Sequence, residues 1–261
     1  MLKKFIRTID DVFLAKKLQK QYGKILNARA QSELESDLNY KIVSFYKKNN
    51  DCEISKLCDI YGSDKGELRK GGHPYPWPSH TYADFYSRLF SHCRTSIKNV
   101  FECGLGTNNP NLLSSMGILG KPGASLRVWR DFFPSAMVYG ADIDKDVLFE
   151  EDRIKTYYID QLDPLAIKGF WDTVGVTDFD FMLDDGLHTF EAGSTLFLHS
   201  IERLASNGVY IIEDVGIADL LRYKKFFSNK DYVVEYVSLF RPNIQLGDNS
   251  LVVIRKSHQT L

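Results

Sequence analysis

Short apolar runs that end in acidic residues are the feature that most restricts the fold of this 261-residue chain. Four such runs occupy 100–102, 137–140, 179–183 and 209–212, and β-rich segments follow at 233–239 and 251–254. Helical patterns lie between most of them. This alternation predicts an α/β fold, with an open, mostly parallel sheet and helices on both faces. Such sheets bind ligands beyond the carboxyl ends of their strands, where this chain places Glu102, Asp142, Asp184, Asp185, Glu213 and Asp214.

The residues before this pattern divide into two segments. Residues 1–60 have apolar side chains at helical spacing, including a second run over 30–48. We expect a helical N-terminal region there, used in packing or in forming a homo-oligomer. Residues 61–97 begin with a long glycine- and proline-rich stretch, which indicates a loop or lid, and continue into a predicted helix over 82–90. Residues 98–261 then form the ligand-binding domain.

Composition argues against several classes of protein. Lysine and arginine number 33 against 34 aspartates and glutamates, so a general electrostatic nucleic-acid binder is not expected. The four cysteines lack zinc-binding spacing, which favours a reduced protein of the cytoplasm. No stretch approaches the ~20 apolar residues of a membrane-spanning helix, and the basic N-terminus lacks the apolar run of a signal peptide.

A glycine-rich turn over 102–107 follows the first apolar run and contains Gly104 and Gly106. Glycines permit backbone conformations and a close ligand approach that a Cβ would prevent. Asn109 stands where a dinucleotide-binding fingerprint needs its third glycine, which disfavours a nicotinamide cofactor. The acid two residues before the first glycine, Glu102, is instead similar to motif I of the class I methyltransferases that use S-adenosylmethionine (SAM).

The next acid-ended run predicts a ribose site. Asp142 directly follows the run and can accept hydrogen bonds from two ribose hydroxyls. Asp144 lies two residues beyond it, and Asp160 and Gln161 are placed to border an adenine pocket. Helix capping or solvation in a loop explains Asp144 and Asp160 equally well.

Carboxylates follow the apolar runs 179–183 and 209–212, and these side chains converge if the two predicted strands are neighbours in the sheet. Three carboxylates at one rim repel one another unless a cation neutralises them. Oxygen ligands suit Mg²⁺ or Mn²⁺ rather than zinc, and the best candidates are Asp185, Glu213 and Asp214. A histidine has an unperturbed pKa of about 6.5, so His188 is a candidate general base, or else a further metal ligand. His73 and His80 are the alternative bases.

From Tyr61 to Val215 the chain resembles the metal-dependent sugar O-methyltransferases of macrolide biosynthesis, of the mycinamicin and macrocin type. The segments that carry the resemblance are 61–66, His80 with Tyr82 and Tyr86, 102–107, 123–126 with Trp129, 133–134, 140–144, 160–161, 184–188 and 213–214. The resemblance implies a seven-stranded Rossmann-like sheet, with a SAM-binding methyltransferase domain over 98–261. In that family the acid of the Asp-Gly-x-His segment and the Glu-Asp pair hold Mg²⁺, and the histidine is the base. The corresponding residues here are Asp185, Glu213, Asp214 and His188.

Together with the motifs, the resemblance implies a set of cofactor-binding residues: Ser63, Lys65, Glu102, Gly104, Gly106, Thr107, Asp142, Asp144, Asp160, Gln161 and Asp184. SAM would donate a methyl group to a sugar hydroxyl of a polysaccharide or of a glycosylated natural product. Mg²⁺ would orient the acceptor, whose sugar could be nucleotide-linked, lipid-linked or polymeric. The competing interpretations are a methyltransferase for a small phosphorylated acceptor, a nicotinamide-dependent sugar oxidoreductase and a non-catalytic partner subunit.

Overall fold

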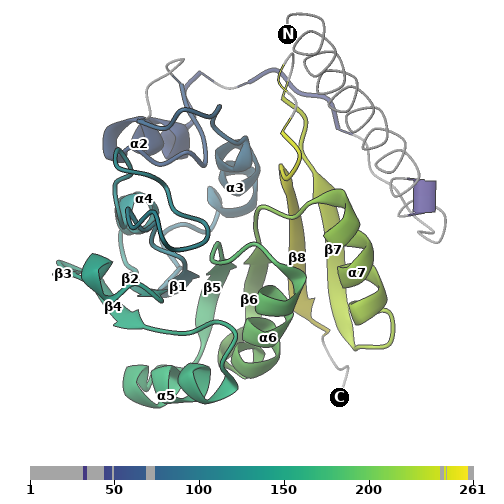
Figure 1. The fold of residues 1–261 in the computed structure, drawn as a ribbon. Coiled ribbons are helices and arrows are strands. Elements are labelled where there is room, and N and C mark those ends of the chain that lie inside the picture. Colours follow the sequence, from purple (N-terminus) through teal and green to yellow (C-terminus); the bar gives the residue numbers. More distant parts are fainter. Residues whose placement is uncertain are drawn as a thin grey trace, which may run out of the picture.

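An eight-stranded sheet lies at the centre of the computed structural model, which describes residues 32–33, 44–48, 50–68, 74–241, 244 and 246–257 (Figure 1). The strands cross the sheet in the order β3-β4-β2-β1-β5-β6-β8-β7. Their bounds are β1 (Asn99–Cys103), β2 (Met137–Asp142), β3 (Glu150–Glu151), β4 (Ile154–Tyr158), β5 (Phe179–Asp184), β6 (Leu204–Ile212), β7 (Tyr232–Ser238) and β8 (Ser250–Lys256).

The five adjacent strands from β4 to β6 are parallel, and the remaining pairs are antiparallel. The predicted open, mostly parallel sheet is therefore confirmed, although the described residues form eight strands rather than seven. The additional strand is the two-residue β3. The sequence did not reveal β4, because only Ile154 of its five residues is buried and no apolar run marks it.

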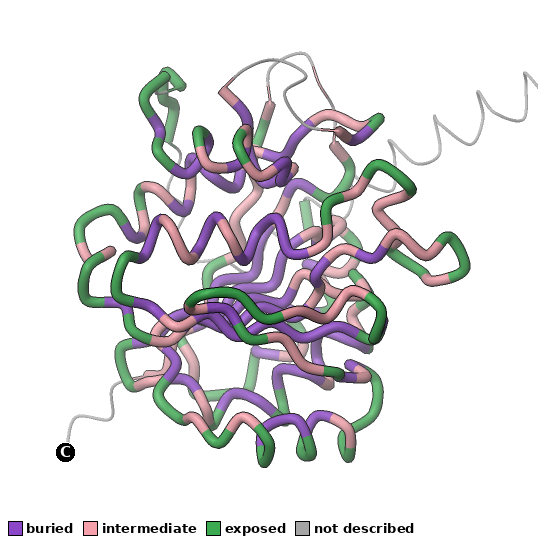
Figure 2. Tube along the Cα trace, turned by 90° about the vertical axis from the view of Figure 1, so that its left-hand side faces the viewer, coloured by how far each residue is buried: buried purple, intermediate pink, exposed green. Residues whose placement is uncertain are grey.

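Helices cover both faces of the sheet, and the buried strands form a band between the two helical layers (Figures 1 and 2). Neighbouring residues of a strand point to opposite faces. Val100 therefore belongs to the core beneath one helical layer and Phe101 to the core beneath the other. The first layer contains α2 (Glu53–Tyr61), α3 (Tyr82–Phe90) and α4 (Ala124–Phe132). The second contains α5 (Pro164–Val174), α6 (Phe190–Ser200) and α7 (Ile217–Phe227), and two short 3₁₀ helices, η1 (Lys145–Val147) and η2 (Ile201–Arg203), complete the described elements.

A buried aromatic cluster around Phe181 of β5 supports the carboxyl ends of the strands. The Phe181 ring centroid lies 4.8 Å from that of Phe90, 5.4 Å from that of Trp129 and 5.7 Å from that of Tyr86. Tyr86 and Trp129 also use their polar atoms, since the Tyr86 hydroxyl donates to Glu213 and the Trp129 indole N–H donates to Glu102. The apolar core thus holds α3 and α4 against the strand ends and positions two acidic side chains there.

The structure describes only parts of the segment before the domain. The helix predicted over 82–90 is α3, with the same bounds. Of the helical run expected over 30–48, the described residues 32–33 are helical and 44–48 are not. Most of the remaining 1–60 region lies outside the described residues, and the homo-oligomer expected from it stays a prediction. Within the described ranges, no helix is both long and apolar enough to cross a bilayer.

Replacing Phe181 with alanine should lower the free energy of unfolding by about 3–5 kcal/mol, because a fully buried ring is lost and its cavity cannot close. Urea denaturation followed by circular dichroism measures this change. Leu165→Ala on α5 is the control, since Leu165 is 78% exposed and its loss should change the stability by less than about 0.5 kcal/mol. Equal stability of the two variants would contradict the central packing role of Phe181.

Candidate active site

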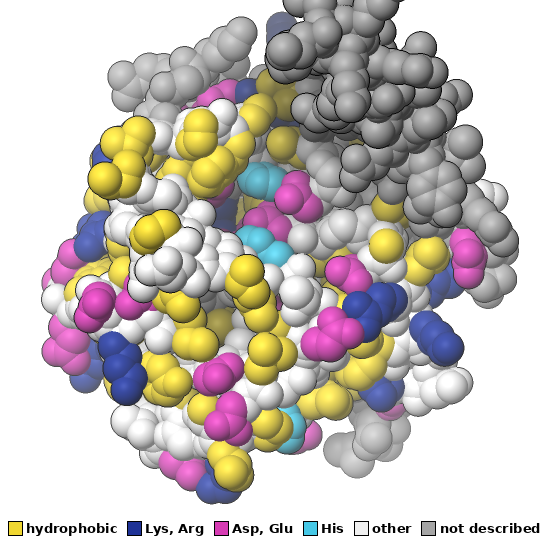
Figure 3. All heavy atoms as spheres, viewed as in Figure 1, with side chains coloured by type: hydrophobic (Ala, Val, Ile, Leu, Met, Phe, Trp, Pro, Cys, Tyr) yellow, Lys and Arg dark blue, Asp and Glu magenta, His cyan; other side chains and the backbone are white. Residues whose placement is uncertain are grey.

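A cavity of about 360 Å³ lies beyond the carboxyl ends of β1, β2, β5 and β6, where the fold class predicts a ligand site. Its inner wall is formed by residues at or after these strand ends and by the segment before α5, namely 103–107, 142–143, 159–162, 185–188 and Asp214. Its outer wall comes from loops beyond the sheet, including 63–65, 113–116 and Asp248. Histidine and acidic side chains gather in the hollow on this face (Figure 3).

The glycine-rich turn forms the floor of the cavity, and its backbone requires glycine. Gly104 and Gly106 have φ angles of +95° and +81°, which L side chains rarely adopt. A Cβ on Gly104 would also lie 2.0 Å from the carbonyl oxygen of Asp185. The turn therefore packs directly against the loop after β5, and a ligand in the cavity contacts both.

Asp142 lines the cavity and also holds the glycine turn in place. Its Oδ2 accepts a hydrogen bond of 2.7 Å from the backbone N–H of Leu105, and its Oδ1 accepts one of 2.8 Å from that of Asp144. Burial raises the pKa of Asp142, and the two backbone N–H groups oppose that rise. The ribose role predicted for Asp142 stays a prediction, and its contacts add a second role, in shaping the turn.

Eight of the eleven predicted cofactor-binding residues line the cavity: Ser63, Lys65, Gly104, Gly106, Thr107, Asp142, Asp160 and Gln161. The other three are buried next to it: Glu102, Asp144 and Asp184.

Two of these three buried carboxylates accept hydrogen bonds from other residues of the predicted cofactor-binding set. Asp144 accepts from the Thr107 hydroxyl and caps η1 through the backbone N–H of Asp146, so the capping role considered for it is present. Asp184 accepts from the Gln161 amide, and burial raises the Asp184 pKa to about 6. Both carboxylates support residues of the cavity wall from behind.

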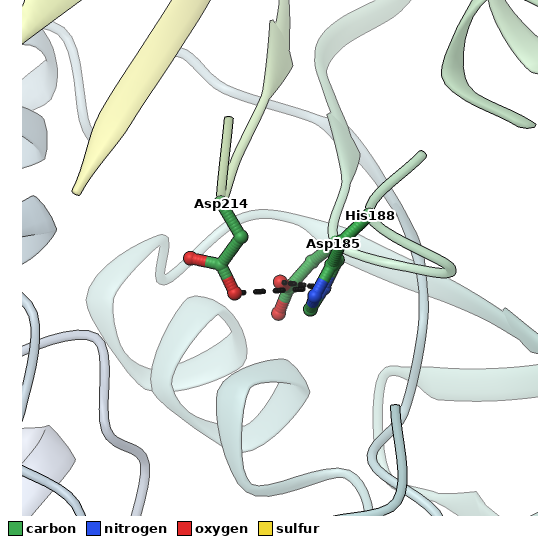
Figure 4. Close-up of side chains that lie close together, drawn as sticks. All are labelled: Asp185, His188 and Asp214. Atoms are coloured by element: carbon green, nitrogen blue, oxygen red, sulfur yellow. Dashed lines mark hydrogen bonds and ion pairs between the residues drawn. The ribbon is translucent and has the colours of Figure 1, made fainter. Parts of the chain in front are cut away.

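Asp185, His188 and Asp214 form a compact cluster (Figure 4), beyond the ends of β5 and β6, whereas Asp142 ends β2 and Asp160 follows β4, on the other side of β1. The His188 Nε2 atom lies 3.2 Å from Asp185 Oδ1 and 3.5 Å from Asp214 Oδ2. Among the described residues, one ligand atom from each of these three side chains lies within 4.8 Å of the others. His188 and Asp214 have φ angles of +57° and +53°. Such left-handed backbone costs about 1–3 kcal/mol per residue and concentrates at functional sites.

The two carboxylates dominate the charge state of His188. Burial alone would lower the pKa of the imidazole, but Asp214 and Asp185 outweigh burial and raise it to about 10. In turn, burial would raise the pKa of Asp185, but Lys65 and His188 lower it to about 2. The two carboxylates therefore favour the protonated form of the His188 imidazole in this structure.

Glu213 was predicted to join Asp185 and Asp214 in holding a metal ion, and in this structure its carboxylate has two buried partners. Its Oε2 pairs with the Lys65 ammonium, and its Oε1 accepts from the Tyr86 hydroxyl at 2.5 Å. The side chain is buried and does not line the cavity. The metal role predicted for Glu213 stays a prediction, and the carboxylates of Asp185 and Asp214 line the cavity.

An aromatic wall from the 61–80 loop closes the outer side of the cavity, and motif analysis alone did not identify it. The rings of Tyr75 and Trp77 are stacked, with centroids 5.0 Å apart and an interplanar angle of 14°. The Trp77 indole N–H donates to Asp64 at 2.7 Å, and the Tyr75 hydroxyl donates to the carbonyl of Gly62 at 2.7 Å. The proline- and glycine-rich composition of this stretch was the only sequence signal for the wall.

His80 also belongs to this outer side. Its Nε2 lies 3.6 Å from Asp214 Oδ1, and its ring stacks on Tyr82 with centroids 4.7 Å apart. The Tyr82 hydroxyl donates to the same Asp214 oxygen at 2.7 Å. Asp214 is therefore flanked by His188 through Oδ2 and by His80 and Tyr82 through Oδ1. His73, the other alternative base, lies outside the described residues.

Comparison with known proteins finds similarity to several methyltransferases. No family model matches it. It is 31% identical over 157 residues to 8-demethyl-8-alpha-L-rhamnosyl tetracenomycin-C 2'-O-methyltransferase of Streptomyces olivaceus, covering 60% of this chain and 38% of that protein. It is 33% identical over 163 residues to demethylmacrocin O-methyltransferase of Streptomyces fradiae, covering 62% and 38%. The chain thus spans less than half the length of the curated relatives it matches.

A solved structure of the same kind shares the fold. The MycE methyltransferase of the mycinamycin biosynthetic pathway, in complex with Mg, SAH and mycinamycin VI, superposes with a TM-score of 0.56 at 22% identity. The match covers 78% of this chain and 54% of MycE. The chain is thus similar to proteins named as O-methyltransferases, and it shares its fold with MycE.

Proposed function

We propose that this protein is a SAM-dependent O-methyltransferase that transfers a methyl group to a sugar hydroxyl, in a glycosylated natural product or a surface polysaccharide. One observation carries the proposal: a single cavity joins the glycine turn and Asp142 to the Asp185–His188–Asp214 cluster. A nucleotide-like cofactor and a proton-accepting, cation-binding centre thereby share one space. The O-methyltransferase names of the relatives support the same activity.

The half of the cavity near β2 suits the cofactor. Asp142 lies at the glycine turn, within the space that a ribose would occupy. Ile143 and Leu162 line the same region and are 48% and 51% exposed, which leaves apolar surface for a planar base. In the proposal, SAM lies along the glycine turn and supplies the methyl group, and Gln161 orders the segment next to the base. MycE was crystallised with SAH, which agrees with this assignment.

The cluster at the other half fits a divalent cation. Asp185 and Asp214 offer carboxylate oxygens to an open cavity, and oxygen donors with space for water suit Mg²⁺ or Mn²⁺. When bound, such an ion supplies positive charge that lowers the pKa of a neighbouring hydroxyl. MycE contains Mg in its structure, in line with this choice of metal.

His188 is the proposed general base. It lines the cavity beside both carboxylates, so a hydroxyl held at the cluster lies within its reach. Those same carboxylates raise the pKa of His188. A positive charge bound to them would offset their effect and lower the pKa of the imidazole. The imidazole is then free to take the hydroxyl proton while Asp185 and Asp214 keep their positions.

The acceptor is proposed to lie between the cluster and the aromatic wall. Trp77 lines the cavity and is held by Asp64, so it presents a fixed apolar surface to one face of a sugar ring. His80 and Asp248 line the same side and can hydrogen-bond hydroxyls of the sugar. The relatives' names specify rhamnosyl tetracenomycin and demethylmacrocin, so those glycosides are the first acceptors to test.

Asp142→Ala should weaken SAH binding by about 1–3 kcal/mol, because charge-assisted hydrogen bonds to the ribose are lost together with the support of the turn. Isothermal titration calorimetry measures the affinity. Asp146→Ala is the matched control, since Asp146 is exposed just beyond the same strand and does not line the cavity. Unchanged SAH affinity in the Asp142 variant would remove this residue from the cofactor site.

Asp214→Asn and Asp185→Asn should each weaken Mn²⁺ binding by about tenfold or more, because one of two carboxylates facing the ion loses its charge. Electron paramagnetic resonance of free Mn²⁺ measures the binding without any acceptor. Asp160→Asn is the control, a carboxylate of the same cavity at its cofactor end. SAH affinity should survive chelation by EDTA, and full methyl transfer after exhaustive chelation would disprove the metal role.

His188→Ala should reduce kcat by about 10²–10⁴-fold, the usual contribution of a general base. The measurement is methyl transfer from labelled SAM to whichever glycoside of the acceptor panel the wild-type protein methylates. SAH and Mn²⁺ affinities should change little, which separates a base from a metal ligand. A variant that loses Mn²⁺ as well would assign His188 to the metal, and a near-normal kcat would move the base to His80.

A further inference from the structure

Lys121 lines the cavity, and its charge has no counter-ion there. Among the residues that the structure describes, no carboxylate lies within ion-pair distance of the Lys121 ammonium. The side chain is nevertheless packed, because a Cβ on Gly62 would lie 2.9 Å from Lys121 Cδ and 3.3 Å from Lys121 Nζ. Pro74 lies 3.3 Å from the same point. The ammonium is therefore placed over Gly62, next to Ser63 in the cavity wall.

The surroundings of this ammonium are otherwise acidic. Six aspartates line the cavity: Asp64, Asp142, Asp160, Asp185, Asp214 and Asp248. The lysines of the same described wall are Lys65 and Lys121. Lys65 is buried, at 3% exposure, whereas Lys121 is exposed. An anionic group that enters from solvent can therefore reach Lys121 without displacing buried side chains, and elsewhere along the wall it would meet carboxylates that repel it.

The proposed position of SAM brings its amino-acid tail to this part of the wall. SAM carries the reactive methyl on a sulfonium that lies between the ribose and the tail. With the ribose at Asp142 and the methyl facing the metal cluster, the tail has to extend along the start of α4. That start lies against the glycine turn, since the Gly123 N–H donates to the Leu105 carbonyl at 2.7 Å. The cavity wall there includes Ser63, Lys121, Ala124 and Ser125.

Resting on the proposed SAM-dependent function, we propose that Lys121 binds the carboxylate at the end of the amino-acid tail of SAM, and the same group of the product SAH. The ammonium donates a charge-assisted hydrogen bond to a carboxylate oxygen, and the two charges neutralise each other. The contact fixes the end of the tail while the ribose site fixes the other end of the cofactor. Lys121 is thus a cofactor-binding residue outside the set that the sequence motifs indicated.

The test compares SAH with decarboxylated SAH, an analogue that keeps the adenosine, the thioether and the amino group and lacks only the carboxylate. Isothermal titration calorimetry gives both affinities. The wild-type protein should bind SAH at least about tenfold more tightly than the analogue, and Lys121→Met should reduce this preference by about tenfold. Lys121→Arg keeps the charge, so its preference should exceed that of Lys121→Met by at least about threefold.

Lys145→Met is the matched control. Lys145 is an exposed lysine of η1 near the proposed ribose site, where it contacts the Tyr158 ring, and it does not line the cavity. Its replacement removes the same charge from the same side of the protein, so the preference for SAH should stay within about twofold of wild type. An equal fall in the Lys121 and Lys145 variants would show a general effect of charge and would overturn the proposal.

Two other results would also overturn it. Equal weakening of SAH and of the analogue in Lys121→Met would mean that the lysine supports the wall and does not contact the carboxylate. An unchanged preference in Lys121→Met would leave an anionic group of the acceptor as the partner of this ammonium. A wild-type protein that bound neither ligand would remove the SAM-dependent function itself, a result distinct from a selective change in the Lys121 variant.

Discussion

The ion cluster around Lys65 is the interaction on which the geometry of the site depends. Glu102, Asp185 and Glu213 come from three neighbouring strand ends and would repel one another in a region with little water. One ammonium contacts all three. Removing one partner of such a buried cluster typically costs about 3–5 kcal/mol, since the remaining charges are left uncompensated. The Lys65 ammonium therefore neutralises negative charge on the interior side of the strand ends, whereas negative charge remains on the side that faces the cavity.

The same lysine joins the outer loop to the sheet. The backbone carbonyl of Lys65 accepts from Ala83 at the start of α3, and that of its neighbour Asp64 accepts from His80. The Asp64 side chain in turn holds Trp77. The aromatic wall is thus built within a few residues of the cation that anchors the carboxylates. One short segment of the chain therefore contacts both the aromatic wall and the charged cluster.

On the side of the strand ends that faces the cavity, each of a few side chains has more than one contact. Asp142 supports the glycine turn through Leu105 and the segment after β2 through Asp144, so the carboxylate proposed to bind the ribose also shapes the cavity floor. Asp214 lies between two imidazoles and a tyrosine hydroxyl, in left-handed backbone. His188 gains its charge from the carboxylates that a cation would occupy. Cation binding and proton acceptance are therefore linked through the same two aspartates.

The sequence by itself determined the features that depend on local pattern. Apolar runs that end in acids predicted most of the strands of the sheet. The glycine turn over 102–107 and the Asp185–His188 spacing indicated the two parts of the candidate site. Each of these signals is encoded within a few consecutive residues. The partly exposed β4 and the short, exposed β3 carry no such pattern, and the sequence did not indicate them. Only the tertiary structure decided the direction of Glu213 and the identity of its partner. Lys65 meets Asp185 and Glu213 across 120 and 148 residues of chain, and no local spacing encodes that contact. It arises because packing of α3 and the segment before it against the sheet brings one buried cation to three strand ends, where electrostatics then fixes which carboxylates face the cavity.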